Sequence, residues 1–97
     1  MPSVKLPAGQ TMQVAVPVED ARNFGMTFVA ATKVSATLTD DKGVVVGANL
    51  TGKPEATQLF RSIHIDRPIT KGTWTLTLQN ADEVERTVVL STWSNAS

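Results

Sequence analysis

The sequence predicts an all-β domain, an antiparallel sandwich of two sheets with about seven strands. Apolar and polar residues alternate with a period of two through most of the chain, as in strands that bury one face. Turn-forming residues separate these segments at the spacing typical of a sandwich, and no segment has the apolar spacing of a helix. A single sheet would leave apolar side chains in water, so two packed sheets are the simplest arrangement.

The first three predicted strands cover residues 11–18, 23–30 and 33–39, and each carries apolar residues at alternate positions. The residues expected on these apolar faces are Met12, Val14, Val16, Val18, Phe24, Met26, Phe28, Ala30, Val34, Ala36 and Leu38. Pro17 has no N–H to donate to a neighbouring strand, so the first of these strands is expected at the edge of its sheet.

Four further strands are predicted over residues 44–50, 58–66, 73–78 and 84–93. The turn at 39–43 contains Asp and Gly and joins its two neighbours as a hairpin. Residues 51–57 form the longest polar interruption and are predicted to be a loop. Trp74 shares one face with Leu76 and Leu78, while threonines occupy the other face, so Trp74 is predicted to lie in the core.

Composition excludes several classes of function. Nine Lys and Arg balance nine Asp and Glu, which disfavours binding to nucleic acid or to an anionic membrane surface. The absence of Cys excludes disulfides, thiolate-bound metals and thiol catalysis. No apolar stretch is long enough for membrane insertion. The length of 97 residues fits one domain, 1–97, which we expect to be a part of a larger protein.

Ser62, His64 and Asp66 occupy alternate positions of one predicted strand, about 6.5–7 Å apart per step. These residue types match a hydrolase triad, and a small hydrolase using Ser62 and His64 is one alternative. However, no Gly-rich segment near Ser62 could supply oxyanion donors. Polar residues on the solvent face of a strand also produce this pattern, so we predict no catalytic site.

We predict no cofactor. His64 is the only histidine, and without Cys a zinc site is not expected. Calcium is the one metal kept in consideration, because it takes oxygen ligands from loops. The acidic pairs at predicted turns are Glu19-Asp20, Asp40-Asp41 and Asp82-Glu83. None has the Asp-x-Asp-x-Asp spacing of a calcium loop, and solvated turn carboxylates are the simpler explanation of these pairs.

The aromatic residues outside the predicted core are the candidates for contact with a partner or ligand. Phe60 lies on the same face as Ser62 and His64, so either a bulge returns it to the core or it contacts a neighbouring domain. Trp93 shares the face of Val89 and Ser91, whereas Val88 and Leu90 lie on the opposite face of the strand. It is expected to cover one end of the sandwich or to face another domain. The predicted contact residues are therefore Trp93, Phe60 and His64.

Three segments carry a resemblance to known modules: VSATLTDDKGVVVG (34–47), FRSIHI (60–65) and KGTWTLTLQN (71–80). Together they resemble the pre-peptidase C-terminal domain and the P domain of proprotein convertases. They are also similar to immunoglobulin-like modules of secreted and cell-surface proteins. The resemblance covers residues 34–80 and implies that Trp74 and the alternating leucines pack the core. It also implies a domain without catalytic residues.

We therefore expect an immunoglobulin-like or jelly-roll-like sandwich that acts as a non-catalytic accessory or interaction domain. Its parent is expected to be a bacterial multidomain protein that is extracellular, on the cell surface or periplasmic. The expected partner is a neighbouring domain or another protein, bound through an apolar or mixed patch because the charges balance. A carbohydrate-binding module is the alternative, with Trp93 and Phe60 as its exposed aromatic residues.

Overall fold

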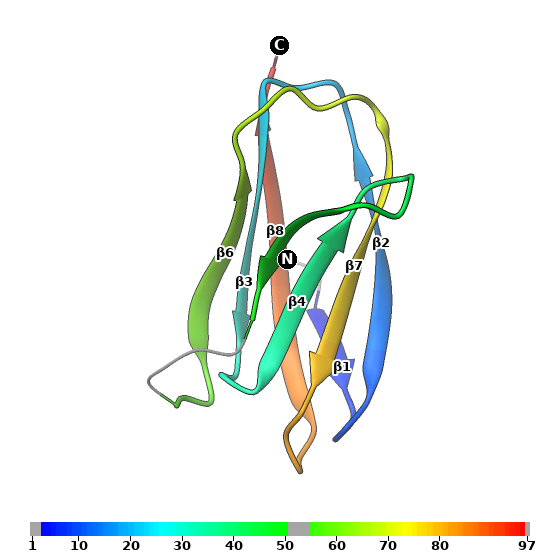
Figure 1. The fold of residues 1–97 in the computed structure, drawn as a ribbon. Coiled ribbons are helices and arrows are strands. Elements are labelled where there is room, and N and C mark those ends of the chain that lie inside the picture. Colours follow the sequence, from blue (N-terminus) through cyan, green and yellow to red (C-terminus); the bar gives the residue numbers. More distant parts are fainter. Residues whose placement is uncertain (1–2, 51–54, 97) are drawn as a thin grey trace.

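The computed structural model describes residues 3–50 and 55–96, which form eight β-strands and no helix (Figure 1). The strands are β1 (Ser3–Leu6), β2 (Thr11–Val18), β3 (Asn23–Ala30), β4 (Val34–Thr39), β5 (Val45–Asn49), β6 (Leu59–Ile65), β7 (Gly72–Asn80) and β8 (Arg86–Asn95). A helix that could cross a membrane is therefore not found in these two ranges.

Two antiparallel four-stranded sheets form the sandwich, which confirms the predicted fold class. Sheet A has the strand order β1-β8-β3-β6, and sheet B has the order β2-β7-β4-β5. Four of the strand pairs are those of one long hairpin, in which the first four strands run against the last four: β1–β8, β2–β7, β3–β6 and β4–β5. Wrapping that hairpin around the core adds the pairs β3–β8 and β4–β7. This is the strand order of a jelly roll rather than of an immunoglobulin domain.

The inward faces of the two sheets make one core. Its fully buried large side chains include Leu38, Leu76 and Leu78 from sheet B and Phe28 from sheet A. Trp74 is 5% exposed and meets Phe24 edge to face, with the ring centroids 5.5 Å apart. The prediction that Trp74 lies in the core is therefore confirmed.

The structure differs from the prediction at the start of the chain. Strand β1, Ser3–Leu6, was not predicted because four residues are too few to show a clear alternation. Met12 was expected on a core face but is 37% exposed, since it lies near the start of β2, which only β7 flanks. Strand β2 is an edge of sheet B, as the position of Pro17 predicted.

A buried arginine joins β6 to sheet B. Arg61 is 5% exposed, and its guanidinium lies 5.1 Å from the ring centroid of Phe28. It donates five hydrogen bonds, to the Asn49 side-chain oxygen and to the backbone carbonyls of Ala31, Val34, Asn49 and Leu50. Burial lowers the pKa of the Arg61 guanidinium from its usual value. Arg61 thereby ties the edge strand of one sheet to the edge strand of the other.

Candidate functional site

The outer surface of sheet A brings two of the predicted contact residues together. Gly25 on β3 lies opposite His64 on β6 and, on its other side, opposite Trp93 on β8. The three residues therefore form one row across three strands. Because side chains directly opposite one another lie close together, Trp93 and His64 both extend over the glycine between them.

Gly25 allows the indole of Trp93 to lie on the sheet. A Cβ atom at Gly25 would stand only 2.1 Å from two carbons of the indole ring, so any larger residue would displace the ring. The ring also packs against His64, with the centroids 5.2 Å apart and the planes tilted by 36°. Trp93 nevertheless keeps 42% of its surface exposed. The aromatic ring is thus fixed in place on one side and open to solvent.

The next two rows of the same surface differ in chemistry. Ser62, Thr27 and Ser91 form a row of hydroxyl groups beside the His64 row. The row beyond it holds Phe60, together with two valines of β3 and β8. Phe60 is 71% exposed. An aromatic side chain therefore stands on each side of the hydroxyl row.

Two of the sequence-based alternatives are settled by this arrangement. Strands β3 and β6 pair in an unbroken register from Phe24 to Ala30, so no bulge returns Phe60 to the core, and that alternative is wrong. The expectation that Trp93 covers one end of the sandwich is also wrong. Strand β8 continues to Asn95, and Trp93 therefore lies on the outer face of sheet A, over Gly25.

A pair of amides completes the surface beyond Trp93. Asn95 donates a side-chain hydrogen bond of 2.8 Å to the side-chain oxygen of Asn23 on β3. We call this whole surface the aromatic face; its residues are Asn23, Gly25, Thr27, Val29, Phe60, Ser62, His64, Val89, Ser91, Trp93 and Asn95. These eleven residues include no Asp, Glu, Lys or Arg, and Lys5, which pairs with Thr87, lies on the same side of sheet A beyond Val89. Within the eight described strands, the only Asp, Glu, Lys or Arg residues are Lys5, Arg61 and Arg86.

Ser62 and His64 do not form a catalytic pair in this structure. In the described ranges no hydrogen bond joins their side chains, and the His64 ring packs against Trp93. Asp66 follows the last residue of β6. Since the nucleophile of a triad needs a base within hydrogen-bond reach, the geometry favours the simple alternation of a solvent-facing strand over a triad.

The acidic residues proposed for calcium act within turns. The Asp40 carboxylate accepts hydrogen bonds from the backbone N–H groups of Val44 and Lys42, and these lower its pKa, the Val44 bond most strongly. A side-chain hydrogen bond from Arg86 is the main cause of the lowered pKa of Asp82. No three His, Asp or Glu residues of the described ranges lie together as metal ligands.

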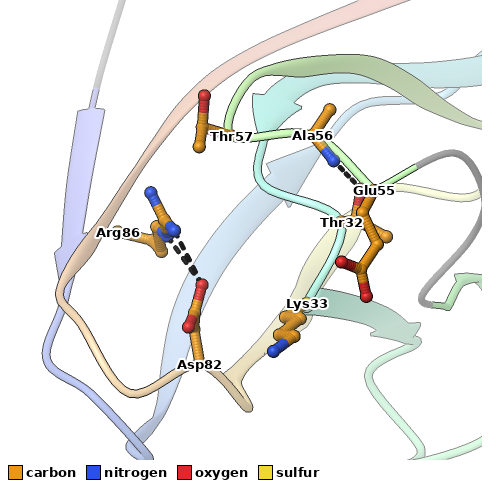
Figure 2. A pocket seen from close by; sticks show the side chains of 7 residues that line it. All are labelled: Thr32, Lys33, Glu55, Ala56, Thr57, Asp82 and Arg86. Carbon is orange, nitrogen blue, oxygen red and sulfur yellow. Dashed lines mark hydrogen bonds and ion pairs between the residues drawn. The ribbon is translucent and has the colours of Figure 1, made fainter.

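A hollow of about 280 Å³ lies where three connecting segments meet at one end of the sandwich (Figure 2). It is lined by Thr32, Lys33, Glu55, Ala56, Thr57, Asp82 and Arg86. Arg86 is paired with Asp82 at 2.8 Å, and the hydroxyl of Thr32 accepts a hydrogen bond from the N–H of Ala56. Because Arg86 and Asp82 already pair with one another, these two side chains of the hollow are less available to a ligand than the exposed side chains of the aromatic face.

Sequence reasoning missed the part that Gly25 plays. A glycine inside a predicted strand marks a site where another group approaches the backbone closely, and that signal was available. What approaches it could not be read from the sequence, since Trp93 comes from a strand near the other end of the chain.

The chain matches no protein-family model and no curated protein.

Proposed function

We propose that this chain is a non-catalytic interaction domain that binds its partner through the aromatic face. The observation that carries the proposal is the placement of Trp93, which is held against Gly25 and His64 while 42% of it remains exposed. An exposed aromatic ring loses little conformational freedom on binding when it is already fixed in place. Such rings contribute a large share of the binding energy at many interfaces.

The neutrality of the aromatic face supports a contact made by packing and hydrogen bonding. The residues of the rows on either side of Trp93 carry hydroxyl and amide groups, and Phe60 adds an apolar group at 71% exposure. Binding through such a surface should depend little on ionic strength, because no charged pair is screened. This expectation separates the aromatic face from the charged turns at the ends of the sandwich.

The wider setting is part of the same proposal. We propose that the domain is an accessory module of a secreted or cell-surface protein, outside the cytoplasm, with a neighbouring domain or a separate molecule as its partner. The resemblance of residues 34–80 to modules of that kind supports this setting. In the described ranges the His64 ring packs against Trp93 and makes no hydrogen bond to Ser62, which supports a non-catalytic role.

Site-specific photo-crosslinking tests the proposed binding surface. A benzophenone amino acid replaces Phe60 in the intact protein, in the cells that make it, and adducts are identified by mass. We expect one saturable adduct that excess unmodified protein competes away and that the additional change Trp93→Ala abolishes. The matched control places the same probe at Gln13, which is exposed on the outer face of sheet B.

Equal labelling at Gln13 and Phe60 would contradict the proposal, because the aromatic face would then behave like any exposed strand. An adduct at Phe60 that persists unchanged in the Trp93→Ala background would also contradict it. Circular dichroism of each variant shows whether the sandwich is retained, so that loss of fold is not mistaken for loss of binding.

A further inference from the structure

We infer that the ligand of the aromatic face is an uncharged polysaccharide chain, an inference that rests on the proposed function of that face. Four properties of the surface lead to this chemistry: an aromatic ring that covers a glycine of the sheet, hydroxyl and amide groups on both sides of that ring, the spacing of the two aromatic residues, and the absence of Asp, Glu, Lys and Arg among the residues of the aromatic face. Each property meets a physical requirement for binding a sugar in water.

The first property is the orientation of Trp93. The indole covers Gly25, because a Cβ atom there would stand 2.1 Å from Cε2 and Cζ2 and 2.5 Å from Nε1; from this close cover we infer that the ring lies along the sheet. The flat side of an aromatic ring carries partial negative charge, and the C–H bonds on the flat side of a pyranose ring carry partial positive charge. A sugar ring therefore stacks on an indole that lies flat. A ring standing upright would present its edge.

The second property is the set of hydrogen-bonding groups around Trp93. The hydroxyls of Ser62, Thr27 and Ser91 lie one row away on one side. The side-chain amides of Asn23 and Asn95 lie on the other side. Hydroxyls and amides both donate and accept, which is what the hydroxyl groups of a sugar require. A protein partner would be better served by a continuous apolar patch, and here the hydroxyl row separates Trp93 from Phe60.

The third property is the spacing of the two aromatic residues along the sheet. The Phe60 row and the Trp93 row are four residues apart along β3, from Val29 to Gly25, which corresponds to about 13 Å. That distance exceeds the size of one sugar ring, so a single monosaccharide would contact one aromatic residue only. A chain of several sugars would contact both Phe60 and Trp93 and cross the hydroxyls between them.

Charge then selects among polysaccharides. Between the Phe60 row and the Trp93 row there is no Lys or Arg to pair with carboxylate or sulfate groups, and no Asp or Glu to pair with amino sugars; Lys5, on the same side of the sheet, pairs with Thr87 beyond these rows. An anionic chain would lose hydration on binding and gain no opposite charge in return. The expected ligand is therefore neutral.

Sheet B offers a control surface within the same molecule. Its outer face carries Thr75 and Thr77 on β7 beside Thr39 and Thr37 on β4, and it too is uncharged and rich in hydroxyl groups. It has no aromatic residue, since Trp74 on β7 points into the core. If hydroxyl groups alone were sufficient for binding, sheet B would bind sugars as well as the aromatic face does.

Affinity electrophoresis of the 97-residue chain tests the inference. The gels contain hydroxyethylcellulose, xyloglucan, galactomannan or laminarin as neutral chains, and polygalacturonate as the anionic comparison. We expect at least one neutral chain to retard the protein. Because stacking on one ring contributes strongly, Trp93→Ala should weaken that retardation by about tenfold. Phe60→Ala should weaken it less, and Thr75→Ala on sheet B should leave it unchanged.

A second variant separates ring orientation from ring content. Gly25→Ala keeps Trp93 but places a methyl group where the indole lies, so the ring must tilt away from the sheet. We expect retardation to fall by about as much as in Trp93→Ala, to within threefold. Indole fluorescence reports the change directly, because Trp93 is 42% exposed and Trp74 is only 5% exposed. Gly25→Ala should increase the quenching of Trp93 by acrylamide.

The outcomes distinguish this inference from the proposed function beneath it. No retardation by any neutral chain, together with a Trp93-dependent protein adduct at Phe60, overturns the inference and leaves the proposed function standing. No retardation and no adduct overturn both. Retardation by polygalacturonate alone, or retardation that Trp93→Ala does not weaken, also overturns the inference.

Discussion

Arg61 shows at the residue scale how one buried side chain can hold the two sheets together. Its five donors are arranged in a planar fork, and each meets an oxygen of the protein without any carboxylate. Lysine could not replace it, because an ammonium group has only three donors and no fork. The acceptors lie in the β3–β4 turn and at the first residue of β4, and at the last residue of β5 and the residue after it, so a single residue of β6 restrains both segments.

Arg61→Met should lower the free energy of unfolding by about 3 kcal/mol or more, because several buried carbonyl groups lose their donor. Urea denaturation followed by circular dichroism measures the change. The matched control is Arg22→Met, which removes an exposed arginine and should alter stability by less than about 0.5 kcal/mol. Similar losses in the two variants would show that the hydrogen bonds of Arg61 stabilise the fold no more than an exposed arginine does.

In the described part of this protein most charged residues lie in the turns, and Lys5 is the charged residue on the outer face of a strand. In the β4–β5 turn Asp40 accepts two backbone hydrogen bonds, and Gly43 adopts a φ of 81°, which favours glycine. In the β7–β8 turn Asp82 accepts hydrogen bonds from Arg86. Both carboxylates are better stabilised in the folded turn than in the unfolded chain, so both turns should respond to acid.

The pKa values of Asp40 and Asp82 are lowered in the folded state, so both groups contribute stability above their unfolded pKa. That contribution is lost as the pH falls through their folded pKa. We expect the free energy of unfolding to decline as the pH falls below about 4, the usual range of an unfolded aspartate. Arg86→Met should reduce this decline, because it removes the main cause of the lowered pKa of Asp82. Urea denaturation at a series of pH values measures both, and a stability that rises on acidification would contradict the expectation.

At the scale of the whole molecule, the first described strand pairs with the last. Strand β1 pairs with β8 through Leu6, which is fully buried, and lies at the edge of sheet A (Figure 1). Asn80, also fully buried, donates from its side-chain amide to the carbonyls of Leu6, Pro7 and Val84. The start of the chain and the turn before β8 are thus joined at one end of the sandwich.

Leu6→Ala should lower the free energy of unfolding by about 3 kcal/mol, since it leaves a cavity at a fully buried position of the core. Leu50→Ala is the matched control, because Leu50 is 63% exposed and its truncation should cost less than about 0.5 kcal/mol. Thermal or urea unfolding distinguishes the two. If Leu6→Ala were as mild as Leu50→Ala, strand β1 would not be needed for the stability of the sandwich.

Local alternation of residue types was enough to predict the sandwich and the side on which most residues lie. Trp74 was placed in the core, and Phe60 and His64 were placed on one face, because a strand turns successive side chains to opposite sides whatever its neighbours are. The same reasoning failed for Met12, where the neighbours decide burial, and for the four residues of β1, where the pattern is too short.

Only the tertiary structure decided which strands are neighbours, and this determines the candidate site. His64, Gly25 and Trp93 meet because β6 and β8 pair with opposite sides of β3, and such pairings between distant segments leave no local signal in the sequence. The acceptors of Arg61 were hidden for the same reason. The sequence alone determined the faces of the strands, since that depends on adjacent residues, and the packing of distant strands decided what those faces carry.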